Sequence, residues 1–141
     1  MAGAGADVIY LEKNQVLEIH RKMVLRYGGL FVKNSDNLQN PCSLEYVLEA
    51  VKASVYGRPL YSTVFEKAAA YAVLIIKDHV FYDGNKRTGL ESGMAFLELN
   101  GSYLRASVSR KEMMSLGPSI ANGEVSLEGV SNWFRTNAST D

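Results

Sequence analysis

The sequence has little cysteine and no net charge, and it contains no long apolar run. Cys42 is the single cysteine, so the chain cannot form an internal disulfide, and we expect a reducing, cytoplasmic environment. The 15 basic and 15 acidic residues cancel, which argues against a nucleic-acid binder with a basic face. Because no apolar run approaches membrane-spanning length, we expect no membrane association.

The remaining composition is that of a globular protein. Of the 141 residues, 47% are hydrophobic and 21% are charged, which is enough to build one domain with a buried core. The first residues are small and lack the pattern of a signal peptide, so we interpret them as a flexible leader or a cloning remnant. The expected division is a leader at residues 1–7, one domain at 8–136 and a tail at 137–141.

Apolar residues recur with a helical period through most of the chain, and little of it alternates with a period of two. The predicted helices cover residues 13–27, 43–55, 64–77 and 85–100, with shorter ones after Ser109 and Ser126. Ser43 is the expected cap of the second helix, and Pro118 is expected to interrupt the chain. The predicted fold is therefore mostly α, a compact helical bundle in a single domain.

Residues 79–89, His-Val-Phe-Tyr-Asp-Gly-Asn-Lys-Arg-Thr-Gly, carry more chemical information than the rest of the chain. Asp-Gly-Asn is typical of a turn, so a helix is expected to begin beside Lys86 and Arg87. Cations are unfavourable at a helix N-terminus unless an anion binds there, and phosphate is the anion that such sites favour. His79 could accept a proton near neutral pH. A base beside a phosphate site indicates transfer of a phosphate-containing group.

Other residues of this run have simpler interpretations. Phe81 is expected to anchor the loop in the core, and Gly84 to supply the backbone conformation of the turn. Asp83 by itself suits a turn or a helix cap, and without a third nearby ligand it does not indicate a zinc site. His20 has no comparable neighbours in the sequence and is expected to be structural.

The run also resembles the motif of the Fic/Doc family, His-x-Phe-x-Asp/Glu-Gly/Ala-Asn-x-Arg. The matching residues are His79, Phe81, Asp83, Gly84, Asn85 and Arg87. The resemblance extends to Tyr10-Leu11-Glu12, to Arg26-Tyr27-Gly28-Gly29 and to residues 61–68, and it covers roughly residues 8–105. Val80, Lys86 and Leu90 stand where AMP-transferring Fic members have Pro, Gly and Arg, so the chain is most similar to the Doc toxins.

The resemblance implies roles for individual residues. It implies ATP and Mg²⁺ as cofactors, with His79 and Arg87 as the catalytic residues and Asp83 as metal ligand. His79 would be the general base, and Arg87 would stabilise the charge on the phosphate. It implies that phosphate is bound by the motif turn and the start of the following helix, at Gly84, Asn85, Lys86 and Arg87. It further implies a short hairpin flap near residues 57–62, where Arg58 and Tyr61 would align the target chain.

The function implied by the resemblance is that of a toxin in a toxin–antitoxin pair. Such a toxin modifies a hydroxyl group on a protein of the translation machinery, which the resemblance indicates to be elongation factor Tu. Lys86 and Leu90 favour transfer of the γ-phosphate of ATP, and AMP transfer is the alternative. We find no self-inhibiting Ser/Thr-x-x-x-Glu-Gly/Asn segment, so an antitoxin acting in trans is expected. A non-catalytic interaction module is the competing class of function, and a helical DNA-binding regulator is disfavoured by the zero net charge.

Overall fold

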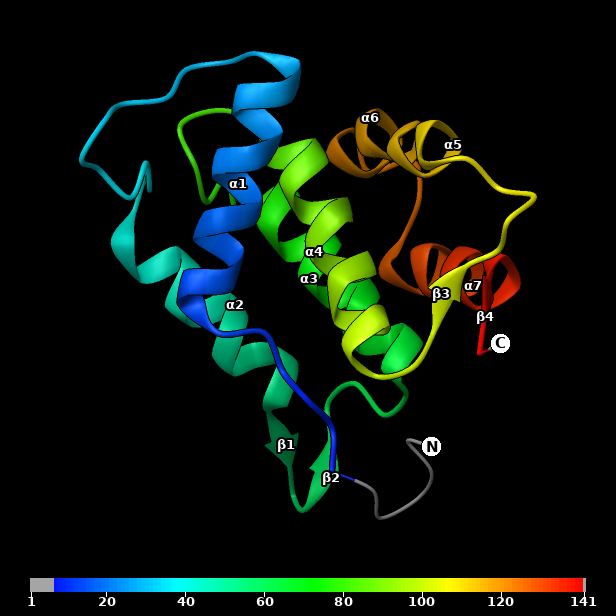
Figure 1. The fold of residues 1–141 in the computed structure, drawn as a ribbon. Coiled ribbons are helices and arrows are strands. Elements are labelled where there is room, and N and C mark those ends of the chain that lie inside the picture. Colours follow the sequence, from blue (N-terminus) through cyan, green and yellow to red (C-terminus); the bar gives the residue numbers. More distant parts are fainter. Residues whose placement is uncertain (1–6, 141) are drawn as a thin grey trace.

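The structure is a computed structural model that describes residues 7–140, so nearly all of the predicted leader lies outside the described residues. It is mostly helical (Figure 1). The helices are α1 (Lys13–Tyr27), α2 (Pro41–Lys52), α3 (Val64–Lys77), α4 (Asn85–Leu99), α5 (Arg110–Met114), α6 (Leu116–Ala121) and α7 (Leu127–Asn137). The short strands are β1 (Ser54–Val55), β2 (Arg58–Pro59), β3 (Tyr103–Leu104) and β4 (Ala138–Ser139). These elements confirm the predicted fold class.

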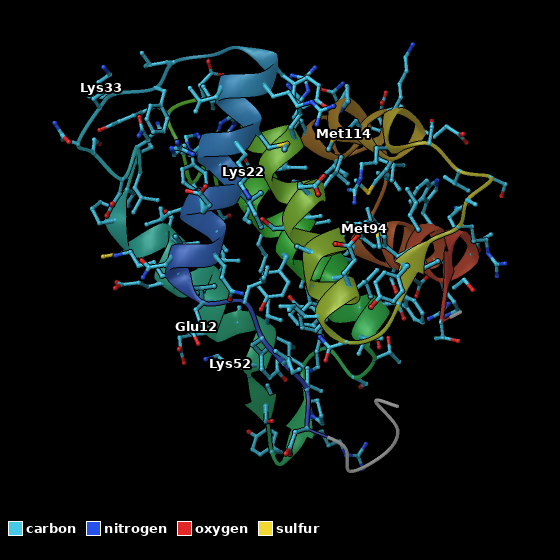
Figure 2. The ribbon with its side chains drawn as sticks, in the orientation of Figure 1. Glu12, Lys22, Lys33, Lys52, Met94 and Met114 are labelled. Atoms are coloured by element: carbon cyan, nitrogen blue, oxygen red, sulfur yellow. The ribbon has the colours of Figure 1, made fainter. Side chains whose placement is uncertain are left out.

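Helix α3 occupies the centre of the molecule. Its side chains are buried on nearly every face, as expected for a helix that is apolar all round. Helices α1 and α2 lie on one side of the α3–α4 pair, and α5, α6 and α7 lie on the other (Figure 1). Met94 of α4 is fully buried in this centre, whereas Lys22 and Lys33 lie at the surface (Figure 2).

The packing of α3 against α4 depends on two glycines. A Cβ atom at Gly89 would lie 2.7 Å from the carbonyl oxygen of Ala72. A Cβ atom at Gly93 would lie 2.7 Å from the carbonyl oxygen of Ala68. Both distances are too short for a side chain, so glycine at these positions lets the two backbones approach closely. This approach fixes the end of α3 relative to the start of α4, and the motif loop joins the two.

Local sequence signals account for most helix boundaries. Thr63 and Ser109 each begin a capping box with a glutamate three residues later, and Ser126 accepts a hydrogen bond from the Gly129 backbone. Two predictions were wrong. Asn40, not Ser43, caps α2, because Pro41 fits the first helical position, where no backbone N–H is needed. For a similar reason Pro118, in the first turn of α6, does not interrupt that helix.

The strands form two small antiparallel pairs. β1 and β2 form a hairpin at residues 54–59, with Tyr56 and Gly57 at positive φ in its turn. β4 pairs with β3, so the region predicted as a tail after residue 136 contains the end of α7 and a short strand. Between residues 7 and 140, no helix is long and apolar enough to cross a membrane.

Candidate active site

The motif loop joins the end of α3 to the start of α4, at the end of the bundle where α1 also ends (Figure 1). The backbone reverses direction through two residues in the left-handed region, His79 with a φ of 47° and Gly84 with a φ of 79°. Glycine adopts this conformation readily, which explains Gly84. A histidine there is uncommon, and its side chain is exposed rather than packed.

A cavity of about 290 Å³ opens beside this loop. The structure brings six of the predicted site residues to its wall: His79, Asp83, Gly84, Asn85, Lys86 and Arg87. Ile76, Tyr82 and Ala121 also line it, and no sequence pattern indicated this. Ala121 lies at the end of α6, some 35 residues further along the chain, and no local pattern could have placed it here.

The N-terminus of α4 faces this cavity. Gly84 is its N-cap, and a glycine has no side chain to accept bonds from the first-turn N–H groups. The first turn contains no acidic residue but contains Lys86 and Arg87, which the helix dipole disfavours. The stem of Lys86 lies against Gly117 of α6, where an added Cβ would come within 2.9 Å of the Lys86 Cβ atom. This arrangement concentrates positive potential and suits a phosphate.

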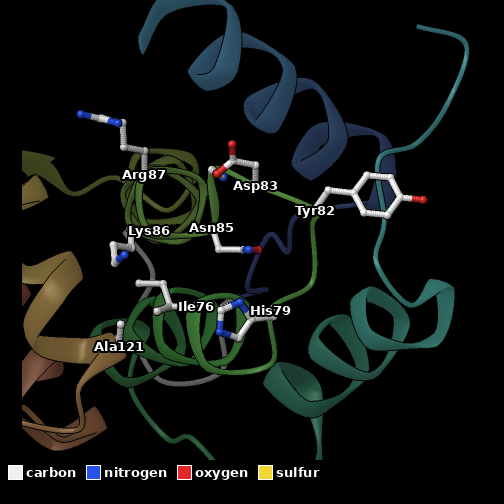
Figure 3. Close-up of a pocket in the computed structure, with 9 residues that line it drawn as sticks. Ile76, His79, Tyr82, Asp83, Asn85, Lys86, Arg87 and Ala121 are labelled. Atoms are coloured by element: carbon white, nitrogen blue, oxygen red, sulfur yellow. Dashed lines mark hydrogen bonds between the residues drawn. The ribbon is translucent and has the colours of Figure 1, made fainter. Parts of the chain in front are cut away.

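The side chain of Arg87 points away from the cavity (Figure 3). Its guanidinium carbon lies 4.5 Å from the centre of the Tyr27 ring, at the end of α1. This is a cation–π contact between two exposed side chains, and such contacts are weak. Arg87 can therefore leave Tyr27 at little cost and turn toward an anion at the helix N-terminus.

The Asp83 carboxylate is exposed and held in a fixed orientation. Its Oδ2 atom accepts a hydrogen bond from the backbone N–H of Leu30 at 2.9 Å, and its Oδ1 atom accepts one from Gly84 at 2.9 Å. The Leu30 bond is the main cause, and the Gly84 bond the second, of an Asp83 pKa below its usual value. Asp83 is thus ionised at neutral pH, and its oxygen atoms are of the kind that Mg²⁺ prefers.

Gly29 makes the contact between Leu30 and Asp83 possible. A Cβ atom at Gly29 would lie 2.9 Å from Asp83 Oδ2, and the φ of Gly29 is 128°. The sequence indicated this glycine only as part of the Arg26-Tyr27-Gly28-Gly29 segment that resembles the family. Its role, leaving room for the Asp83 carboxylate, depends on a contact between residues more than 50 positions apart, which the sequence does not reveal.

The amide of Asn85 supports the loop. Its Oδ1 atom accepts a hydrogen bond from the Phe81 backbone N–H at 2.9 Å, and its Nδ2 atom donates one to the Phe81 carbonyl at 3.0 Å. The predicted contact with phosphate therefore has only the second N–H of Nδ2 available. Phe81 is fully buried, as expected of a core anchor, and this pair of bonds fixes its backbone.

His20 of α1 lies directly against the motif loop. It is almost fully buried, its Nε2 atom lies 2.8 Å from the carbonyl oxygen of Asp83, and its ring stacks on Phe81 at 4.0 Å between centroids. Burial is the largest influence on the His20 pKa and lowers it, so the ring is neutral at neutral pH. The sequence indicated a structural histidine but not that it would touch the motif.

Comparison with known proteins agrees with this geometry. The sequence profile of the Fic/DOC family matches residues 10–97, which is more than half of the chain. The chain belongs to the Fic/DOC family. It is 30% identical to "Protein kinase doc" of Escherichia phage P1, over 89% of this chain and 93% of that protein. It is 27% identical to "Toxin Doc" of Mycolicibacterium smegmatis, over 79% of this chain and 86% of that protein.

This Fic/DOC chain does not place its hairpin at the active site. Arg58 and Tyr61 precede α3, whereas His79 follows it, and a 14-residue helix is about 20 Å long. Figure 1 shows the β1–β2 hairpin at the opposite end of the bundle from the motif loop. The predicted hairpin therefore exists, but the structure does not bring Arg58 and Tyr61 to the cavity.

The segment between α1 and α2 lies beside the motif instead. Leu38 pairs with Phe81 in an isolated β-bridge. The Gln39 backbone N–H donates to the Val80 carbonyl at 2.8 Å, and the Tyr82 N–H donates to the Asn37 carbonyl at 3.0 Å. In this Fic/DOC domain, the segment that flanks the motif loop is therefore residues 28–40, for which the sequence predicted no regular element.

The described part of the chain has no ready-made metal cage. Among residues 7–140, no group of three or more His, Cys, Asp and Glu side chains lies close enough to hold a metal ion. Mg²⁺ does not need one, because it binds through one or two carboxylates together with water and substrate phosphates. The exposed, ionised Asp83 lies beside a helix N-terminus that suits a phosphate, and it fits that donor set.

Proposed function

We propose that this protein is the toxin of a toxin–antitoxin pair and transfers the γ-phosphate of ATP to a hydroxyl group of a translation protein. The main support is one observation: His79, Asp83 and the cation-flanked N-terminus of α4 share a single cavity. The names of the two relatives, a protein kinase and a toxin, point in the same direction. The target suggested by family resemblance is elongation factor Tu.

The proposed chemistry uses His79 as the general base. Its exposed side chain would accept the proton of the target hydroxyl while the hydroxyl oxygen forms a bond to the γ-phosphorus. The bond to the oxygen that bridges the β- and γ-phosphorus atoms breaks, and ADP leaves. Lys86, Arg87 and the first N–H groups of α4 would stabilise the negative charge on the phosphate oxygens.

Mg²⁺ would supply charge neutralisation on the phosphates when it is bound. Asp83 would hold it, because two backbone N–H groups orient this carboxylate and lower its pKa. The bonds from Leu30 and Gly84 occupy one lone pair on each oxygen, and each carboxylate oxygen has a second one for a metal. The cavity, at about 290 Å³, is at the lower end of the usual range for ligand pockets and has room for phosphates rather than a whole nucleotide.

Two residues favour the γ-phosphate over AMP transfer. Lys86 adds a side chain and a charge where AMP-transferring Fic relatives have a glycine. Leu90 stands where those relatives have a second arginine, and it is fully buried, so this turn of α4 offers no second cation to clamp the outer phosphates. Both differences disfavour the ATP orientation that attack on the α-phosphorus requires. Neither disfavours an orientation in which the γ-phosphate is attacked.

Inhibition would come from a separate antitoxin. A segment of that partner that folds on binding would cover this domain, since the sequence has no self-inhibiting motif. Expression of this chain without a partner should arrest growth in a host that carries the target. Normal growth under those conditions, with the protein present at the expected level, would contradict the toxin assignment.

The transfer reaction is tested with ATP labelled at either the α- or the γ-phosphate. Purified protein is incubated with elongation factor Tu and Mg²⁺, and label on the target is measured together with its mass. Label from the γ position and a mass gain of one phosphate support the proposal. Label from the α position and a gain of one AMP would show an AMP-transferase instead.

His79→Asn is the matched inactive control. Asparagine tolerates the positive φ of residue 79 better than alanine does, and it cannot act as a base. We expect at least a ~100-fold loss of transfer with an unchanged melting temperature. If the variant still arrests growth when transfer is abolished, a non-catalytic interaction module becomes the better explanation.

A further inference from the structure

His20 contacts the active-site loop at two points. Its Nε2 atom is 2.8 Å from the carbonyl oxygen of Asp83, and its ring lies parallel to Phe81, with 5° between the planes and 4.0 Å between centroids. A backbone carbonyl can only accept a hydrogen bond, so Nε2 carries the proton and donates. His20 is 1% exposed and therefore has no route to the substrate itself.

The carbonyl that His20 holds belongs to the peptide group between Asp83 and Gly84. That group is planar, so fixing its C=O also fixes the direction of the Gly84 N–H. The same Gly84 N–H donates to Oδ1 of the Asp83 carboxylate at 2.9 Å. One rigid peptide group therefore connects the His20 ring to the orientation of the Asp83 side chain.

Among residues 7–140, the hydrogen bond to the carbonyl oxygen of this peptide comes from His20. The Asn85 amide holds the backbone of Phe81, and the Asn37 carbonyl accepts from the N–H of Tyr82, so these three bonds precede the peptide in question. Gly84 follows it, and the Thr88 N–H donates to the Gly84 carbonyl at 3.0 Å, which holds the next peptide group rather than this one.

We propose that His20 is a positioning residue, which holds the 83–84 peptide group and, through it, the Asp83 carboxylate and the first turn of α4 in the orientation that transfer requires. This inference rests on the proposed function for its effect on transfer. Its structural part, the restraint of one peptide group by a buried ring, can be measured without any reaction.

Two substitutions distinguish the effect of the His20 hydrogen bond from the effect of its ring stacking on Phe81. His20→Phe keeps an aromatic ring to stack on Phe81 but leaves the Asp83 carbonyl without its donor. His20→Gln loses the stacking but places an amide N–H near the position of Nε2. Val16→Ala is the control, because Val16 is fully buried in the same helix, one turn earlier, and its truncation destabilises the core.

The first measurement is hydrogen exchange at the Gly84 amide. We expect exchange in His20→Phe to be at least ~10-fold faster than in the wild type, and His20→Gln to lie between the two. Val16→Ala should show no selective change at this amide. Unchanged exchange in His20→Phe, or an equal change in Val16→Ala, would overturn the positioning role, whether or not the protein catalyses the proposed transfer.

The second measurement is transfer as a function of Mg²⁺ concentration. Residues that orient a metal ligand typically contribute 10- to 100-fold, so His20→Phe should lower kcat or raise the half-saturating Mg²⁺ concentration by about that factor. His20→Gln should recover most of this loss. Full activity in His20→Phe would refute the link to transfer. No transfer by the wild type would refute the proposed function, and the exchange result would then decide the positioning role alone.

Discussion

Small residues beside the motif control the geometry of individual functional groups. Gly28 and Gly29 both have positive φ, and both end α1. They differ in what surrounds them, because a Cβ atom at Gly28 would meet nothing within 4 Å, whereas one at Gly29 would collide with the Asp83 carboxylate. Alanine substitution at both positions strains the backbone, but only the substitution at Gly29 also displaces the candidate metal ligand. Comparing the two variants therefore distinguishes these two effects.

We predict that Gly28→Ala and Gly29→Ala both lower stability, by about 1 kcal/mol or more, because neither φ suits a side chain. Only Gly29→Ala should also weaken Mg²⁺-dependent transfer, since it pushes Asp83 away from the Leu30 N–H. Thermal unfolding and the Mg²⁺ dependence of transfer measure the two effects. Equal loss of transfer in both variants would contradict the role given to Asp83.

Arg87 provides a second test at the level of single residues. Its matched control is Arg26, which contacts the same tyrosine ring. Arg26 and Arg87 both lie over the Tyr27 ring, at 5.5 and 4.5 Å from its centre. We predict that Arg87→Ala lowers transfer by at least ~100-fold, because it removes a charge from the phosphate site. Arg26→Ala should keep near-wild-type transfer. Both should unfold within a few degrees of the wild type, since exposed cation–π contacts contribute only about 0.5–1 kcal/mol.

At the level of elements, the site depends on how closely α3 and α4 approach. The candidate base His79 follows α3 and the candidate phosphate site begins α4, so a shift between these helices changes the shape of the cavity. Gly93 marks one point of closest approach, and its neighbour Ser92 is buried with a hydroxyl that makes no hydrogen bond within residues 7–140. Alanine substitution should therefore have opposite effects on stability at these two adjacent positions.

We predict that Gly93→Ala destabilises the fold by about 1–3 kcal/mol, since its Cβ would lie 2.7 Å from the Ala68 carbonyl and force the helices apart. Ser92→Ala should be neutral or stabilising, because it removes a buried polar group that has no partner. Chemical denaturation of both variants tests this. A tolerated Gly93→Ala would mean that the α3–α4 contact adapts more easily than the structure indicates.

At the level of the whole molecule, distant segments are joined by buried polar contacts. Tyr71 is fully buried in α3, and its hydroxyl oxygen accepts a hydrogen bond from the Leu11 backbone N–H, 60 residues away. Burial is the main cause of a Tyr71 pKa raised from 10.0 to about 12, and the Leu11 bond works in the opposite direction. The folded state therefore binds this proton more tightly than the unfolded state.

We predict that the Tyr71 contribution to stability is complete below pH 10 and is lost as the pH rises from 10 through about 12. Wild type and Tyr71→Phe should therefore differ by a constant amount in unfolding free energy below pH 10, and the difference should shrink above it. Thermal unfolding over this range measures it. A difference that stays constant up to pH 12 would show that Tyr71 ionises as easily in the folded chain.

Local sequence patterns were enough to predict the helical fold, the approximate boundaries of α1, α3 and α4, and the motif with its histidine, carboxylate and cations. These follow from helical periodicity, capping residues and turn chemistry, which all act over a few neighbouring residues. Sequence reasoning misplaced the cap of α2, where Asn40-Pro41 and Ser43 are competing signals. It also assigned Arg58 and Tyr61 to a site whose cavity they do not reach.

The contacts between distant residues and the motif become visible in the folded chain alone. Folding brings His20, Gly29 and the 37–39 segment to the loop, and it places the β1–β2 hairpin with Arg58 at the far end of α3. These contacts depend on the direction in which each helix leaves the core and on how closely neighbouring helices pack. Those quantities are set by the complementarity of whole surfaces, and no short stretch of the chain contains them.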